Sequence, residues 1–166
     1  RRGNGYGTTG APTSRCRVTI EQMAPRDAQM YWMSSKIPND QFLLFCFDSP
    51  TQDIASVRAV IAERATRIAD LRVRAVDVAA QLDYWGPRDE SQVPITVHAP
   101  ADSSWPHCRS AIAALLTSTV EVRESPWHLH LFPGVNGAPR VPGEALVAVL
   151  QVSHALADGR RATEAA

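Results

Sequence analysis

The sequence contains a single lysine, Lys36, and no excess of either charge, because 17 acidic residues balance 17 basic ones. A chain with a formal net charge of zero has no overall field that would attract nucleic acid. We therefore expect no nucleic-acid partner. The three cysteines, Cys16, Cys46 and Cys108, are far apart and form no CxxC pair. This pattern argues against a disulfide framework and a structural zinc site, and a reducing cytoplasm suits it best.

The sequence also lacks long apolar runs. No window approaches the roughly 18 consecutive apolar residues of a membrane span, and the start has no apolar core of a signal peptide. Residues 1–15 are rich in Gly, Thr and Arg without apolar periodicity, so we expect a flexible leader there. The 45% hydrophobic content of the 166 residues is typical of a globular protein, and residues 16–166 are predicted to form one domain.

Apolar patterns predict strands and helices in a mixed order. Strands are expected over 41–48, 93–99, 126–134 and 145–154, and helices over 25–33 and 103–120. The run QFLLFCFD (41–48) is apolar enough for a strand buried on both faces. After it, Ser49 as N-cap and Pro50 in the first turn predict the start of a long helix that extends to about Leu71. This order favours a layered α/β (α+β) domain, in which helices pack on a mixed sheet.

The run LQVSHALADG (150–159) ends a predicted strand with a histidine. His154 is followed one turn later by Asp158, and Gly159 permits a tight bend. A neutral imidazole held at the end of a rigid strand is suited to removing a proton from a hydroxyl, amine or thiol. A structural histidine that bonds a backbone carbonyl is the alternative.

Three blocks of the sequence resemble one family in the same order. VSHALADG (152–159) is similar to the HHxxxDG motif of the CoA-dependent acyltransferase superfamily, and SPWHLHLFPGVNGAP (125–139) resembles the PLWE strand and hairpin before it. MAPRDAQMYWM (23–33), followed by FLLFCFD (42–48), resembles the N-terminal part of bacterial wax ester synthase/diacylglycerol acyltransferases. The chain thus resembles the N-terminal half of such an enzyme, with a half-domain of the chloramphenicol acetyltransferase type.

The resemblance implies an activity and a set of site residues. A fatty acyl group would pass from acyl-CoA, as a substrate and with no cofactor, to diacylglycerol or a long-chain alcohol. His154 would be the general base, and Asp158 would be a structural residue that orients it. Gly159 and Ser153 would belong to the substrate-binding part of the motif. A second polypeptide or C-terminal half would complete the tunnel, and the protein would contact a membrane or lipid droplet peripherally.

The sequence departs from the family motif at two positions. Ser153 replaces the first histidine, and His128 stands near the place of the PLWE acid. Because successive strand residues point to opposite faces, we expect Ser153 to lie outside the pocket of His154. Three alternatives to acyl transfer to a lipid hydroxyl stay open: an inactive homologue that binds lipid or a partner chain, a condensation-type enzyme that forms amides, and a structural subunit.

Other histidines and aromatic residues carry weaker hypotheses. His128 and His130 share a strand face and could ligate a metal, but the sequence supplies no third ligand, so we predict no metal and a partly exposed polar face. His107 and Cys108 could suggest a cysteine nucleophile activated by a histidine. They are neighbours on a predicted helix, however, where adjacent side chains point apart, so Cys108 is expected in the core instead. The four tryptophans are expected to pack rather than to bind bases.

Overall fold

The protein is represented by a computed structural model that describes residues 19–50, 52–78, 81–99 and 101–156. Along the chain the elements are β1 (Glu21–Gln22), α1 (Pro25–Ser34), β2 (Gln41–Asp48), α2 (Ile54–Ala65), a 3₁₀ turn η1 (Ala69–Arg72), β3 (Val73–Val78), β4 (Gln81–Pro87), β5 (Ile95–Val97), α3 (Trp105–Leu115), β6 (Trp127–Asn136) and β7 (Glu144–Val152). The described residues include no helix with the length and apolarity of a membrane span.

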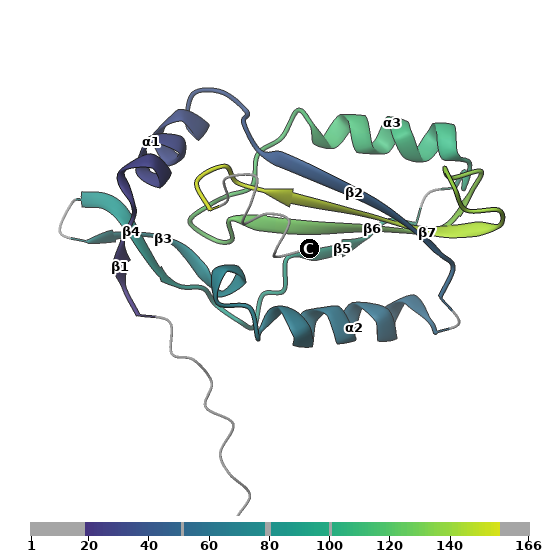
Figure 1. Ribbon diagram of the computed structural model, residues 1–166, viewed down its shortest axis with the longest axis horizontal. Helices are drawn as coiled ribbons and strands as arrows, with labels where there is room; N and C mark the ends of the chain where they lie inside the picture. Colours follow the sequence, from purple (N-terminus) through teal and green to yellow (C-terminus); the bar gives the residue numbers. More distant parts are fainter. Residues whose placement is uncertain (1–18, 51, 79–80, 100, 157–166) are drawn as a thin grey trace, which may run out of the picture.

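The larger sheet has the strand order β2-β7-β6-β5. β7 pairs antiparallel with both β2 and β6, whereas β5 and β6 run parallel and are joined through α3. Figure 1 shows α3 on one side of this sheet and α2 on the other. The predicted layered α+β architecture, with helices packed on a mixed sheet, is confirmed.

The core follows from the alternation of side chains along β7. Val147 and Val149 are fully buried on the α3 face, where they pack with Phe132 of β6 and Cys108 of α3. Leu146, Ala148, Leu150 and Val152 alternate with these valines along β7. They point to the opposite face of the sheet, where they pack toward α2 in a second apolar cluster. A strand that is buried on both faces needs an uninterrupted run of apolar residues. In β7 this run is ALVAVL, residues 145–150. The core position predicted for Cys108 is confirmed by its exposure of 1%.

A smaller sheet of β1, β4 and β3 was not expected from the sequence. It packs with α1 around Met23, Ala75 and Val122. Gly86 of β4 lies against Val76 of β3, where a Cβ atom would come within 2.8 Å of the valine side chain. A glycine is therefore needed for these two strands to approach each other closely.

The prediction that 41–48 is a strand buried on both faces is half wrong. β2 forms as expected, but it is the edge strand of the larger sheet and none of its residues is fully buried. Leu44 and Phe47 are 45% and 52% exposed. Apolar composition alone cannot distinguish a central strand from an edge strand whose faces are covered only in part.

The predicted start of the second helix is also wrong. α2 begins at Ile54, because the side chain of Asp53 accepts hydrogen bonds from the backbone and hydroxyl of Ser56 at 2.9 and 2.7 Å. These bonds hold the pKa of Asp53 below its usual value. The helix ends at Ala65, and η1 follows after a short connection. Within η1, the Leu71 carbonyl accepts a hydrogen bond from the indole N–H of Trp127.

Candidate functional site at the end of strand β7

β7 presents His154 just beyond its last paired residue. Val152 lies between Gln41 of β2 and Trp127 of β6 in the sheet. The chain then turns, and the backbone N–H of Ser153 donates to the carbonyl of Pro126 at 2.8 Å. The imidazole of His154 is partly exposed, and its Nδ1 atom lies 3.3 Å from Nε2 of Gln41. The sheet thus positions the histidine that the sequence singled out.

Ser153 closes the turn that carries His154. Its side chain is fully buried, and its Oγ accepts a hydrogen bond from the backbone N–H of Ala155 at 3.3 Å. Its carbonyl accepts from Leu156 N at 3.0 Å. The buried hydroxyl and the partly exposed imidazole occupy different environments. Asp158 and Gly159, the other predicted site residues, lie outside the described residues.

Replacing Ser153 by histidine should destabilise the protein. The site has no exposed surface, so a larger ring must displace packed neighbours, which should lower the free energy of unfolding by about 1–3 kcal/mol. Ser153→Ala, which removes only the bond to Ala155, should cost about 1 kcal/mol. Urea unfolding measures both. A Ser153→His protein as stable as the wild type would contradict the tight packing described here.

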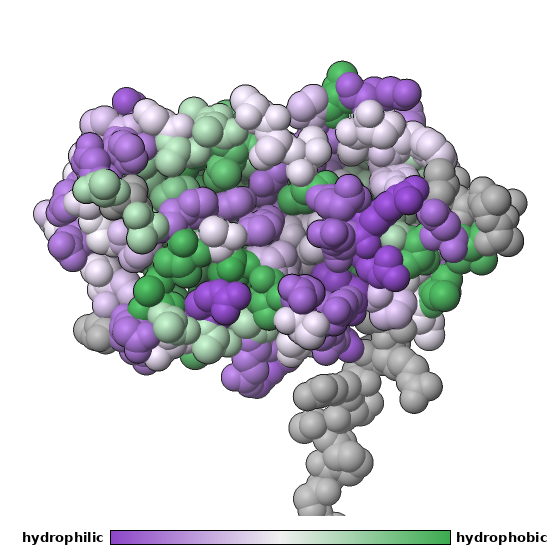
Figure 2. Space-filling model, turned by 180° about the vertical axis from the view of Figure 1, so that it is seen from behind, coloured by the Kyte–Doolittle hydropathy of each residue, from purple (hydrophilic) through white to green (hydrophobic). Residues whose placement is uncertain are grey.

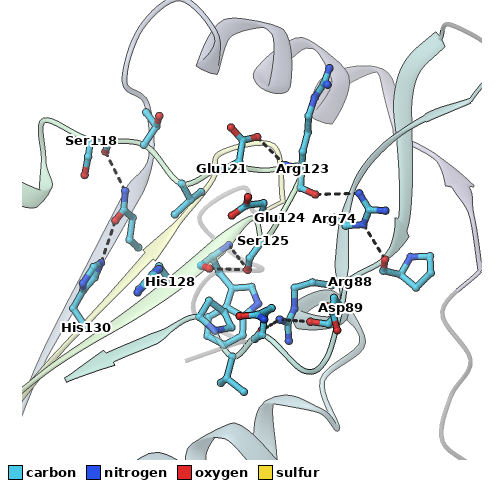
Figure 3. Close-up of a pocket in the computed structure, with 18 residues that line it drawn as sticks. Arg74, Arg88, Asp89, Ser118, Glu121, Arg123, Glu124, Ser125, His128 and His130 are labelled. Carbon is cyan, nitrogen blue, oxygen red and sulfur yellow. Dashed lines mark hydrogen bonds between the residues drawn. The ribbon is translucent and has the colours of Figure 1, made fainter.

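A cleft of about 930 Å³ opens at the same end of the larger sheet. In Figure 3, His128 and His130 lie on one side of it and Arg74, Arg88 and Asp89 on the other. Glu124 and Ser125 lie between these two sides. The lining is rich in polar and charged groups, so this cleft suits a polar group better than an acyl tail. His154 is not among the residues that line it.

A hydrogen-bonded network fixes the wall of the cleft formed by β6 and β7. Gln151 is buried, and its amide nitrogen donates to Oδ2 of Asp40 at 2.7 Å and to the Ser118 carbonyl at 3.1 Å. Since the nitrogen faces two acceptors, Oε1 of Gln151 faces Nε2 of His130, 3.3 Å away, and must accept from it. Nδ1 of His130 then accepts from Nε2 of His98 at 3.0 Å. The carboxylate of Asp40 thereby sets the neutral tautomers of both rings.

The histidines near the cleft all have a lowered pKa. Burial, followed by the neighbouring His128, lowers the pKa of His130 to about 4. Burial also lowers the pKa of His128 and of His98. His128 stacks on His130 at 4.5 Å between ring centroids, and its Nε2 lies 2.8 Å from the Thr96 hydroxyl. The described residues contain no group of three or more metal-ligating side chains.

The placement of the paired histidines corrects one detail of the sequence prediction. His128 and His130 do share one face of β6, as alternation predicted. His128 is partly exposed, whereas His130 is only 7% exposed and belongs to the interior network. A buried position is compatible with the polar ring because both of its nitrogens have hydrogen-bond partners.

The stability of the protein should fall as the pH drops from about 6.5 to about 4. The ordinary pKa of histidine is 6.5, and that of folded His130 is about 4, so only the unfolded chain binds this proton in between. The expected loss from this group is on the order of 2–3 kcal/mol. Urea unfolding at about pH 7 and about pH 4.5 measures it. His130→Gln should show a smaller dependence on pH, and identical dependence in both proteins would contradict the shift.

Arg88 lies on the other side of the cleft and reaches the ring of Trp127 at the start of β6. Arg88 is 8% exposed, and its guanidinium carbon lies 5.8 Å from the centre of the Trp127 ring. Its Nη1 donates to the carbonyls of Asp89 and Gln92. Burial lowers the pKa of Arg88. The positive charge stays inside because the π face and the carbonyl oxygens replace water around it.

Sequence reasoning did not find the cleft or its network. The polar residue Gln151, which interrupts the apolar β7 run two positions before Ser153, was the available signal. Its partner Asp40 lies 111 residues away in the sequence. No local pattern links residues at that separation.

Comparison with known proteins gives a fold and no sequence family. No family model and no curated protein matches the sequence. The structure is similar to the wax ester synthase/diacylglycerol acyltransferase from Marinobacter aquaeolei VT8, with a TM-score of 0.63 and 18% identity over 87% of this chain and 37% of that one.

Condensation domains are similar to the same degree. A mutant starter condensation domain of rhizomide synthetase, in complex with C8-CoA, matches with a TM-score of 0.60 and 12% identity, over 82% of this chain and 31% of that one. The first condensation domain of the calcium-dependent antibiotic synthetase, in complex with a substrate analogue, matches with 0.60 and 11%, over 82% and 34%. The chain has the fold shared by these acyltransferase and condensation enzymes, and it spans about a third of their length.

Proposed function

We propose that this chain is the N-terminal part of an acyltransferase that transfers a fatty acyl group from acyl-CoA to a lipid hydroxyl, either diacylglycerol or a long-chain alcohol. The observation that carries the proposal is the partly exposed imidazole of His154, held at the end of β7 in a fold that an acyltransferase shares. The sequence of Ser153 to Gly159 supports the same assignment, because it resembles the family motif.

His154 acts as the general base in this proposal. Its ring takes the proton of the acceptor hydroxyl, and the oxygen attacks the carbonyl carbon of the thioester. The carbon–sulfur bond then breaks, and the CoA thiolate leaves and takes up the proton from the ring. Asp158 orients the turn, Gly159 shapes it around the substrate, and the buried Ser153 holds it through its hydrogen bonds to Ala155 and Leu156. The reaction needs acyl-CoA as a substrate and no resident cofactor.

Formation of an amide is the second candidate. Condensation domains are as similar to this chain as the wax ester synthase is, and a neutral imidazole can accept a proton from an amine as well as from an alcohol. The polar lining of the cleft also suits a polar acceptor. The third candidate is an inactive homologue that binds lipid or a partner chain. It is considered because Ser153 stands where the family motif has its first histidine.

A second polypeptide or a C-terminal half completes the proposed enzyme. The chain spans about a third of the similar structures, and Leu44 and Phe47 of the edge strand β2 are exposed. Figure 2 shows a further apolar area on the side of the molecule where α2 lies. Exposed apolar side chains of this kind favour contact with another protein surface or with lipid. We place the protein in the cytoplasm, in peripheral contact with a membrane or lipid droplet.

One product analysis distinguishes these candidates. The protein, together with its second half, is incubated with palmitoyl-CoA and either a long-chain alcohol, diacylglycerol or an aminoacyl carrier protein, and products are identified by mass spectrometry. An ester is expected, with palmitoyl-CoA a better donor than acetyl-CoA because each buried methylene contributes up to about 0.8 kcal/mol. An amide as the sole product would favour the condensation reaction. Binding of acyl-CoA without any product would favour the inactive homologue.

A further inference from the structure

Asp40, just before β2, and Gln41, the first residue of β2, contact the end of β7 and the turn after it. Oδ2 of Asp40 accepts hydrogen bonds from the Gln151 amide at 2.7 Å and from Val120 N at 2.8 Å. Gln41, the next residue, reaches His154 in the turn that follows β7. Adjacent residues of an extended chain point in opposite directions. One residue therefore fixes the strand end, and the other contacts the imidazole.

The sheet itself fixes the position of Gln41. Gln41 lies opposite Val152 in the antiparallel register, two residues before His154. Its main chain cannot move relative to the ring without breaking the pairing of β2 with β7. The ring of a partly exposed histidine can turn about two side-chain torsions, and a partner on a fixed strand restricts that rotation. In the described part of the chain, Gln41 supplies the only hydrogen bond to the His154 ring.

The Gln41 amide also determines which nitrogen of the ring carries the proton. In the structure its Nε2 faces Nδ1 of His154, so Nδ1 accepts and the proton of the neutral ring is on Nε2. If the amide turned by half a rotation, Oε1 would stand at the same position. The ring must then donate from Nδ1, and the lone pair of Nε2 becomes available to take a proton from an acceptor.

We propose that Gln41 is a positioning residue that sets the orientation and the tautomer of His154. The catalytic meaning of this assignment rests on the proposed function, in which His154 acts as the base. The assignment predicts two distinct roles for one amide. When its nitrogen donates, the ring presents an N–H group at Nε2, and when its oxygen accepts, the ring presents a base there.

Two substitutions of Gln41 separate these roles. Gln41→Met keeps the length of the side chain but cannot hydrogen bond with the ring as an amide does. Gln41→Glu supplies only acceptor atoms when ionised and so requires the proton on Nδ1. Long-range ¹H–¹⁵N correlation spectra of the histidine rings report the tautomer of His154 in each protein. We expect a mixture of both tautomers in Gln41→Met and the Nδ1–H form in Gln41→Glu.

Activity gives a second measurement in the enzyme joined to its second half. In Gln41→Met the ring is free to rotate and to take either tautomer, so only part of the molecules present a base at Nε2, and kcat should fall about tenfold with little change in KM. Gln41→Glu should retain most of kcat, because it holds the ring in the tautomer that a base requires. Gln22→Met, which changes an exposed glutamine of β1, is the matched control and should leave both the ring signals and kcat unchanged.

Unchanged His154 ring signals in both Gln41 variants would overturn the assignment, whatever the activity. An active His154→Ala enzyme would instead count against the proposed function. The two failures are therefore distinguishable, because the spectra measure the ring directly and need no turnover.

Discussion

In the proposed acyltransferase, replacing His154 by alanine should lower the rate of acyl transfer by about two to four orders of magnitude, the usual effect of losing a general base. His130, the buried histidine of the cleft, cannot take over its role. His128 and His130 line the cleft at the same end of the sheet, but the nitrogens of His130 are both engaged, and the pKa of His130 is lowered to about 4. The rate constant for transfer from palmitoyl-CoA, measured under saturating acceptor, tests this prediction.

Folding should survive the change at His154. The side chain is partly exposed, and the turn around it is held by the backbone and hydroxyl of Ser153. His107→Ala provides a matched control, because His107 is exposed on α3. It should retain the activity of the wild type. A His154→Ala enzyme with an unchanged rate would remove the imidazole from the mechanism.

Replacing Trp127 by alanine should lower the free energy of unfolding by about 3–5 kcal/mol. Trp127 is 2% exposed and packs in the apolar cluster between the larger sheet and α2. Its indole N–H donates to the Leu71 carbonyl at 2.8 Å, and its ring covers the guanidinium of Arg88. The substitution opens a cavity, and it also removes one hydrogen bond to the buried Leu71 carbonyl and the π face beside the Arg88 guanidinium.

Urea unfolding of the wild type and two tryptophan variants measures this loss. Trp32→Ala is the control, since Trp32 of α1 is 48% exposed. Its loss of stability should be clearly smaller than that of Trp127→Ala. Equal losses in the two variants would contradict the central role of Trp127.

The sequence predicted the elements whose signals are local. A helix was predicted over 103–120, and α3 forms inside that range at Trp105–Leu115, capped by the Ser104 side chain, which accepts a hydrogen bond from His107 N at 3.4 Å. The alternation in β6 placed His128 and His130 on one face. The apolar β7 run ending at His154 was also recognised from neighbouring residues alone.

Features that depend on distant partners could not be predicted in this way. The edge position of β2 follows from the strand order, which no single segment encodes. β3 and β4 were missed because their burial depends on α1 and on Val122 of a later loop. The bonds of Gln41 to His154 and of Asp40 to Gln151 join residues more than 100 positions apart. The site residues Asp158 and Gly159 stay predictions.

The pairing of β2 with β7 has a consequence for synthesis of the chain. In the part of the chain that the structure describes, β7 is the only strand that pairs with β2, and Gln41 meets Val152 in that register. On the ribosome, the apolar segment Phe42–Phe47 emerges about 100 residues before its partner does. β6 and β7 are joined by a short hairpin and can associate as soon as both are made, whereas β2 must wait. A nascent chain therefore exposes an apolar, unpaired segment for most of its translation. Chaperones that bind apolar segments should bind Phe42–Phe47 during that time.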